Sequence, residues 1–181
     1  NYLELRSELE REGCVFRSRS DTEVLLLGYR QWGQEVLKRL KGFFSFALWD
    51  ARRKSLFCAR DPLGKKPFYY CLTANRFVFA SEVEALIGGL GSRPEIDFSQ
   101  LSHYLWTGYF APGTSIYKSV RVLRPGHALE VSRDLEAVRE WPHSEVRFSY
   151  DVGGSEDYKA FLMNCEGLFG RAVSRRLQSD V

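Results

Sequence analysis

Four short apolar runs between residues 43 and 81 form the strongest pattern in the chain, and they predict β-strands. The runs cover residues 43–49, 55–59, 67–72 and 76–80. Polar turns separate the first run from the second and the third from the fourth, which is typical of antiparallel hairpins. In the first run the apolar Phe44 and Phe46 alternate with the apolar Ala47 and Trp49. A strand that is apolar on both faces is covered on both faces, so we expect this sheet to lie inside a layered domain.

The segment that joins the two hairpins, residues 60–67, cannot be an ordinary strand. It contains two prolines, which lack a backbone N–H, and a glycine, which permits a positive φ. We interpret Arg60 and Asp61 as an internal ion pair or as a lock of this turn. Lys65 and Lys66 are interpreted as solvated side chains.

Helical periodicity is found on both sides of these strands. It predicts helices over residues 2–11, 20–32, 34–40, 82–87, 99–106 and 155–177. Ser20 and Glu23 have the S-x-x-E spacing of a capping box, so the second helix should begin there. Residues 108–124 are expected to be irregular. A last strand is predicted over residues 127–131, directly after a Pro-Gly turn.

Composition narrows the class of protein. The chain has 181 residues, of which 44% are hydrophobic and 14% aromatic, and this suffices for one packed domain of ordinary size. The net charge of +3 comes from scattered Lys and Arg residues and not from a basic stripe, so a nucleic-acid partner is not expected. No apolar run approaches the roughly 18 residues of a membrane span, so no membrane partner is expected either.

The cysteines and histidines give no sign of a metal site. Cys14, Cys58, Cys71 and Cys165 lie far apart and form no CxxC pair, which favours reduced thiols in a cytoplasmic protein. The three histidines show no ligand spacing and are interpreted as structural. The sequence also lacks a nucleophile elbow, an HExxH motif and a phosphate loop.

Asp21 is the sharpest candidate for a functional residue, because the capping pattern places it at the start of a helix. On one interpretation it is a first-turn carboxylate that the helix dipole favours. On the other, a carboxylate held at this position pairs with the ammonium group of a ligand. Spacing alone leaves both interpretations open.

Several segments, in a fixed order along essentially the whole chain, resemble the glutamine-hydrolysing asparagine synthetases and their close relatives. They are SRSDTEVLLLGY, FSFALWD, ARDPLGKKPFYY, FASEVEAL, GYFAPGTSIYKSVRVLRPGHALEV and RRLQSDV. RDPxG-type and SDTEV-type segments also occur in other class II glutamine amidotransferases. The PGHALEV and RRLQSDV segments favour the asparagine synthetase branch.

The resemblance implies an α+β fold of the N-terminal-nucleophile type, in which two antiparallel sheets are stacked between helical layers in the order αββα. Residues 1–140 would form a glutamine amidotransferase type-2 domain that lacks its N-terminus. Residues 141–181 would form a linker and the first helix of an α/β synthetase domain. We expect a polypeptide that is incomplete at both ends, because Met163 is the only methionine and the chain stops directly after a strong helix.

The implied activity is glutamine hydrolysis that supplies ammonia for the ATP- and Mg²⁺-dependent amidation of aspartate to asparagine. The family's cysteine nucleophile, oxyanion donors and carboxylate-binding arginine would lie upstream of Asn1. We therefore assign no catalytic or metal-binding residue in this chain, and we expect it to be inactive and free of cofactor on its own. Asp21 matches the family's substrate carboxylate, which pairs with the α-ammonium of glutamine. The resemblance is compatible with a homodimer.

Two alternatives stay open. The chain could come from another class II amidotransferase of purine, hexosamine or polysaccharide biosynthesis. It could also be a non-catalytic binding module with the same fold. A cysteine directly after the initiator methionine, upstream of the present residues, would favour an enzyme.

Overall fold

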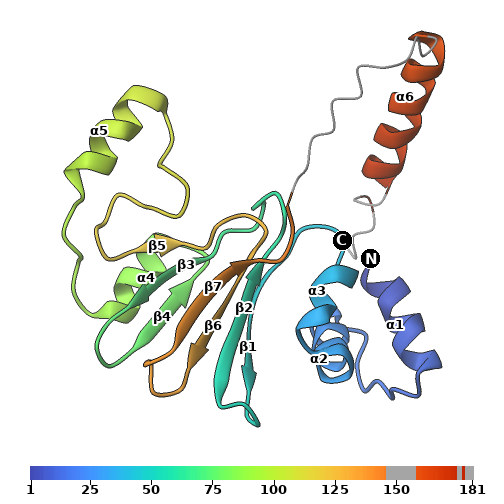
Figure 1. The fold of residues 1–181 in the computed structure, drawn as a ribbon, viewed down its shortest axis with the longest axis horizontal. Helices are drawn as coiled ribbons and strands as arrows, with labels where there is room; N and C mark the ends of the chain where they lie inside the picture. The colour runs from blue at the N-terminus through green and yellow to red at the C-terminus, as the bar shows by residue number, and fades with distance from the viewer. Residues whose placement is uncertain (146–157, 175–176, 178–181) are drawn as a thin grey trace.

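The computed structural model describes residues 1–145, 158–174 and 177, and the elements in this part of the chain lie in layers (Figure 1). The helical layer consists of α1 (Tyr2–Arg11), α2 (Asp21–Trp32), a 3-10 turn (Gly33–Glu35) and α3 (Val36–Arg39). The first sheet has the strand order β1-β2-β6-β7, with bounds Ser45–Asp50, Ser55–Arg60, His127–Ser132 and Val138–Pro142. The second sheet has the order β4-β3-β5, with bounds Phe77–Ala80, Tyr69–Leu72 and Arg121–Val122. The remaining helices are α4 (Val83–Leu90), α5 (Phe98–Thr107) and α6 (Tyr158–Ser174).

Both faces of the first sheet are covered, as the apolar pattern predicted. On one face the fully buried Phe57 packs among Val36, Leu37 and other side chains of the helical layer. On the other face its neighbour Cys58 packs against Tyr70 and further residues of the second sheet. Successive residues of one central strand therefore anchor two different cores.

The outer face of the second sheet is covered in turn by α4. Leu86 is fully buried there and packs with Cys71 of β3 and Tyr117. The layers thus follow in the order helices, sheet, sheet, helix, which confirms the α+β fold with the αββα arrangement.

The four predicted strands form, but the two hairpins belong to different sheets. The β1–β2 hairpin pairs with β6 through β2, and the β3–β4 hairpin pairs with the two-residue strand β5 through β3. The sequence interpretation missed β5, which lies in the stretch expected to be irregular, and β7. Strand β7 pairs with β6 along its whole length and continues to Pro142, so the sheet extends past the predicted domain boundary near residue 140.

Helix α4 is longer than predicted, because it continues through Gly88 and Gly89 to Leu90 and is capped by Gly91, whose φ is +77°. A Cβ at Gly89 would lie 2.9 Å from Cγ1 of Val78, so this glycine lets the helix approach β4 closely. The last helix was predicted over residues 155–177 and is observed as α6. The rest of that prediction, like the linker before it, falls largely outside the described residues.

A buried carboxylate locks the crossover between the two sheets. Asp61 is fully buried, and its side chain accepts hydrogen bonds from the backbone N–H groups of Leu63 (3.1 Å), Lys65 (3.0 Å) and Lys66 (3.0 Å). Its carbonyl oxygen accepts a further bond from the N–H of Gly126, at 2.9 Å. The side chain therefore folds the turn around itself and the backbone ties the turn to the start of β6.

Arg60 completes this lock from the other side. Its guanidinium donates to the carbonyl oxygens of Lys66 (2.7 Å), Leu123 (2.7 Å) and Gly64 (2.6 Å). Of the two interpretations offered above, the structure shows the turn lock: each side chain binds the backbone and not the other side chain. Gly64 has a φ of +62°, and a Cβ there would lie 2.8 Å from Cγ of Pro125, so the turn requires glycine.

The end of the sandwich is fastened to the same turn. Nε2 of His143 lies 2.9 Å from the carbonyl oxygen of Arg60, and the N–H groups of His143 and Ser144 donate to the carbonyl oxygen of Gly126. Burial lowers the pKa of His143 below its ordinary value of 6.5, although the bond to Arg60 opposes this shift. The imidazole is therefore predominantly neutral at pH 7 in the folded state.

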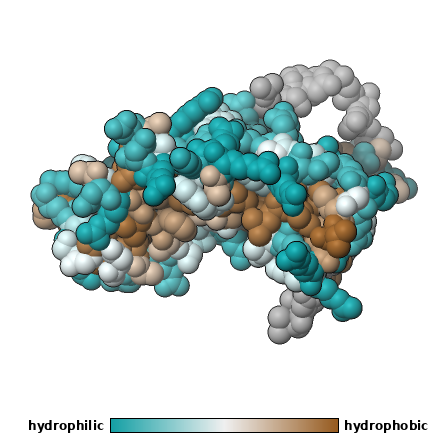
Figure 2. All heavy atoms as spheres, turned by 90° about the horizontal axis from the view of Figure 1, so that it is seen from below, coloured by the Kyte–Doolittle hydropathy of each residue, from teal (hydrophilic) through white to brown (hydrophobic). Residues whose placement is uncertain are grey.

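Apolar side chains remain exposed on the surface of the molecule. Seen from below in Figure 2, they gather toward both ends of the long axis, near the second sheet and near the helical layer. None of the helices in the described ranges is both long enough and apolar enough to cross a bilayer.

The lock predicts a large loss of stability for Asp61→Ala. The substitution leaves three backbone N–H groups without their acceptor, and hydrogen bonds to charged groups contribute about 1.5–3 kcal/mol each. We expect the free energy of unfolding to fall by at least about 3 kcal/mol in urea denaturation. The control is Asp134→Ala, because Asp134 is exposed and accepts one backbone bond, from Glu136. Equal losses in the two variants would contradict the lock.

His143 predicts a pH dependence of stability. Because its pKa is lowered in the folded state, the unfolded chain binds more protons as the pH falls below 6.5. The contribution of His143 is therefore complete above that pH and is lost as the pH falls toward the lower, folded-state pKa. The free energy of unfolding, measured by urea denaturation, should fall less between about pH 7.5 and about pH 5 in His143→Gln than in the unaltered chain. An unchanged loss would show that other groups cause it.

Candidate functional site

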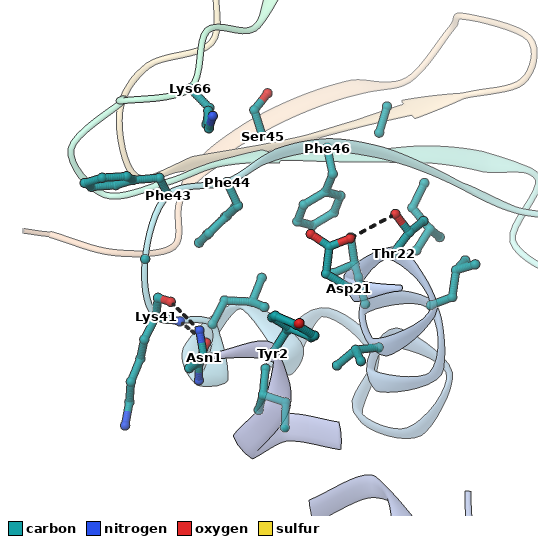
Figure 3. A pocket seen from close by; sticks show the side chains of 18 of the residues that line it. Asn1, Tyr2, Asp21, Thr22, Lys41, Phe43, Phe44, Ser45, Phe46 and Lys66 are labelled. Atoms are coloured by element: carbon teal, nitrogen blue, oxygen red, sulfur yellow. Dashed lines mark hydrogen bonds between the residues drawn. The ribbon is translucent and has the colours of Figure 1, made fainter. Parts of the chain in front are cut away.

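A cleft of about 1070 Å³ separates the helical layer from strand β1. Apolar side chains of α2, of the α3–β1 connection and of β1 form most of its lining, among them Leu25, Leu40, Phe44 and Phe46. Figure 3 shows the rings of Phe44, just before β1, and of Phe46, in β1, pointing into the space above α2. Such a mostly apolar cleft with a few polar groups is the usual form of a small-molecule site.

Asp21 lies at the N-terminal end of α2 and lines this cleft, where it is the one acidic residue among the described lining residues. It is the first residue of α2, and Ser20 caps the helix by accepting a hydrogen bond from the N–H of Thr22, at 3.1 Å. Figure 3 shows the carboxylate directed toward the ring of Phe46. The capping pattern thus placed the helix start correctly.

The second half of the predicted capping box is formed differently. Glu23 does not bind the N–H of Ser20 but accepts from the N–H groups of Arg17 (2.8 Å) and Ser18 (2.6 Å) and from Oγ of Ser18 (2.6 Å). The Ser18 hydroxyl, followed by the Arg17 N–H, lowers the pKa of Glu23. This carboxylate is therefore occupied in shaping the loop that precedes α2.

Asp21, in contrast, is left available for a ligand. Among the described residues, its Oδ1 accepts two long hydrogen bonds, both of 3.4 Å, from the hydroxyls of Ser20 and Thr22. Within the described part of the chain, no Lys or Arg side chain forms an ion pair with it. An exposed, cation-free carboxylate at the edge of an apolar cleft can accept hydrogen bonds from an ammonium group.

The sequence analysis did not identify the polar groups on the other walls of the cleft. Lys66 follows the locked turn and lines the cleft together with Ser45, whose hydroxyl donates to the carbonyl oxygen of Pro67 at 3.0 Å. Lys66 is exposed, as predicted, but Figure 3 shows it above the same space that Asp21 faces from below. Its proximity to the cleft depends on where the folded turn lies over the helical layer, and the local sequence predicts the turn but not this placement.

Asn1 closes the lower wall. Its side chain accepts from the N–H of Lys41 (2.9 Å) and donates to the carbonyl oxygen of Arg39 (3.0 Å). The start of α1 is thereby tied to the segment that enters β1. The cleft consequently has walls from several separate parts of the chain.

Other candidate chemistry is weak in the described residues. They contain no group of three or more His, Cys, Asp or Glu side chains arranged to hold a metal ion. All four cysteines are free thiols, and burial raises the pKa of the Cys58 thiol, which disfavours its reactive thiolate form. The cleft with Asp21 is therefore the candidate site.

Comparison with known proteins shows to which family this fold belongs. The chain is 38% identical over 182 residues to asparagine synthetase [glutamine-hydrolyzing] 3 of Bacillus subtilis, which covers 100% of this chain and 29% of that protein. It is 35% identical over 185 residues to a putative asparagine synthetase [glutamine-hydrolyzing] of Mycobacterium bovis, covering 100% of this chain and 28% of the relative. The chain thus spans less than a third of the length of these relatives.

Among solved structures, the fold resembles the glutamine phosphoribosylpyrophosphate amidotransferase of B. subtilis. The TM-score is 0.55 at 22% sequence identity, over 80% of this chain and 27% of that chain. A family described as the glutamine amidotransferase domain matches residues 1–142, which end with strand β7. The chain therefore belongs to the glutamine amidotransferase domain family.

Proposed function

We propose that this chain is part of a glutamine-hydrolysing asparagine synthetase, in which it supplies most of the domain that releases ammonia from glutamine. The observation that carries this proposal is Asp21, a cation-free carboxylate at the edge of an apolar cleft in a domain of this family. The two asparagine synthetases compared above support the choice of branch.

The hydrolysis would follow the two steps of thiol amidotransferases. A thiolate from a part of the polypeptide upstream of Asn1 attacks the side-chain carbonyl carbon of glutamine. The tetrahedral intermediate collapses, the C–N bond breaks, and the nitrogen leaves as ammonia after it takes up a proton. Water then hydrolyses the thioester, which gives glutamate and restores the thiol.

The residues of this chain bind and orient the substrate. Asp21 accepts hydrogen bonds from the α-ammonium group, and its negative charge has no competing cation in the cleft wall formed by α2. Phe44 and Phe46 contact the methylene groups of glutamine and exclude water from them. Holding the substrate at both points fixes its amide relative to the upstream nucleophile.

Open strand edges indicate where upstream segments would add. Strand β1 lies at the edge of its sheet, β4 lies at the edge of the other, and the candidate cleft extends along β1. An uncovered edge presents unpaired backbone groups to any further strand. We propose that segments preceding Asn1 complete both sheets and bring the nucleophile to the cleft.

The synthetase reaction belongs, in this proposal, to the rest of the polypeptide. Residues 141–181 would lead into a synthetase domain, in which ATP and Mg²⁺ activate aspartate and the ammonia displaces the activated group. No described residue of this chain takes part in that step. Free thiols fit a reducing, cytoplasmic setting, and pairing of two copies of the complete enzyme is compatible with the proposal.

The role of Asp21 predicts a selective effect of Asp21→Asn in the complete enzyme. The change removes a charge-assisted hydrogen bond to the substrate ammonium, so kcat/KM for glutamine should fall by about tenfold to a hundredfold. Synthesis with free ammonia should change little, because ammonia does not need the glutamine cleft. Both rates are measured on one enzyme preparation, together with its melting temperature.

The control is Glu4→Gln, which removes an exposed first-turn carboxylate from α1. It tests the helix-dipole interpretation. The rates with glutamine and with ammonia should stay unchanged, and the melting temperature should change slightly. Equal loss of the glutamine and ammonia reactions in Asp21→Asn would assign Asp21 to helix stability and refute its substrate role.

A further inference from the structure

Helix α5 presents an uncovered apolar stripe that neither the cleft nor the sandwich uses. The stripe consists of Phe98, Leu105 and Trp106, which are 72%, 75% and 90% exposed. Tyr109 follows the helix beside it, is 62% exposed and packs the edge of its ring against His103 of α5. At 3.6 residues per turn, the three helical members fall within about 100° around the helix axis. Large apolar side chains gathered on one helix face mark an interaction surface, whereas single exposed ones are ordinary.

The start of the helix is tied to the domain, but the rest of the helix stands apart from the core. Asp97 caps α5 by accepting from the N–H groups of Ser99 and Gln100, and its own N–H donates to the carbonyl oxygen of Ile116, at 2.8 Å. No residue of α5 belongs to any of the core clusters formed by the described residues. The stripe is thus presented on a helix that is anchored at its start and is not used by the core.

The stripe can be buried at little electrostatic cost. Helix α5, with the sequence FSQLSHYLWT, contains no Asp, Glu, Lys or Arg. A partner surface would therefore not have to remove water from a charged group of this helix.

The size of the stripe favours a tethered partner over a separate molecule. Aromatic side chains bury about 150–250 Å² each, so the stripe offers on the order of 500 Å². With an equal area on the partner, the interface would bury about 1000 Å² in total, which is below the roughly 1200–2000 Å² of stable interfaces between separate chains. It lies within the approximately 600–1500 Å² that is usual between domains of one chain.

The position of the stripe indicates which domain this is. Figure 1 shows α5 on the same side of the sandwich as the end of β7, from which the chain continues toward α6, and opposite the tips of the three hairpins. Helix α6 also leaves apolar side chains exposed, including Phe161, Leu168 and Phe169. The relatives are more than three times as long as this chain, so most of their length lies outside the region that it matches.

We propose that the α5 stripe is the docking surface for the domain that the chain enters through α6 in the complete polypeptide. The inference rests on the proposed function in one respect, that the 181 residues are part of a longer enzyme. Docking at α5 would hold the two domains in one orientation, which a transfer of ammonia between their sites requires.

The test is hydroxyl-radical footprinting of the complete polypeptide, read residue by residue by mass spectrometry. Trp106 and Tyr109 should be oxidised several-fold more slowly than in the same polypeptide unfolded in urea, and dilution should not change this. In Leu105→Asp the oxidation of both residues should rise. Leu3→Asp is the control, because Leu3 is half-exposed on α1 and belongs to no core cluster, and it should leave both rates unchanged.

A second variant covers the case in which Leu105→Asp unfolds the helix. Trp106→Ala keeps a strong helix former and should still raise the oxidation of Tyr109. Oxidation of Trp106 at the unfolded rate in the complete polypeptide would overturn the proposal. Protection that disappears on dilution would also overturn it, because it would identify a second copy as the partner.

The same preparations are assayed for glutamate release from glutamine, which separates the two claims. Glutamine hydrolysis with an open stripe would count against the docking surface alone. A protected stripe without hydrolysis would count against the proposed function and leave the docking surface in place.

Discussion

The arrangement of the two sheets depends on one buried carboxylate, Asp61, at the crossover between them. A charge without water is costly unless hydrogen bonds replace its hydration. Three backbone N–H groups of the following turn do so, and Arg60 satisfies three carbonyl oxygens of the same region. These bonds connect the end of β2, the approach to β3, the end of β5 and the start of β6. Because His143 binds the carbonyl oxygen of Arg60, the exit of the chain from the sandwich is set by the same turn.

The geometry of the cleft follows from this lock. The turn directs Lys66 to the upper wall, and the hydroxyl of Ser45 holds Pro67 beside it. On the lower wall, Ser20 caps α2 and Glu23 shapes the preceding loop, so neither task falls to Asp21. Because Ser20 and Glu23 make the local hydrogen bonds, the carboxylate of Asp21 is left available to a ligand. The fold around it belongs to the glutamine amidotransferase domain family.

The sequence predicted the local elements well, because each depends on neighbouring residues. Strands β1 to β4 follow from apolar runs between polar turns, and the start of α2 follows from Ser20. The sheet membership of each hairpin could not be predicted, since it depends on β6 pairing with β2 across about 70 residues of sequence. Strand β5 has two residues, and β7 carries exposed polar side chains such as Arg139, so neither has a local signal. Asp21 was found from its position, but its freedom from other partners appears only when the bonds of Glu23 are known.

The most direct test of the account is a crystal structure of the complete polypeptide that has reacted with a thiol-alkylating glutamine analogue. The account predicts that the analogue occupies the cleft between α2 and β1, with its ammonium nitrogen within hydrogen-bond distance of the Asp21 carboxylate, about 2.7–3.2 Å. An analogue bound outside this cleft, or one whose ammonium group binds a different acceptor while Asp21 faces solvent, would contradict it.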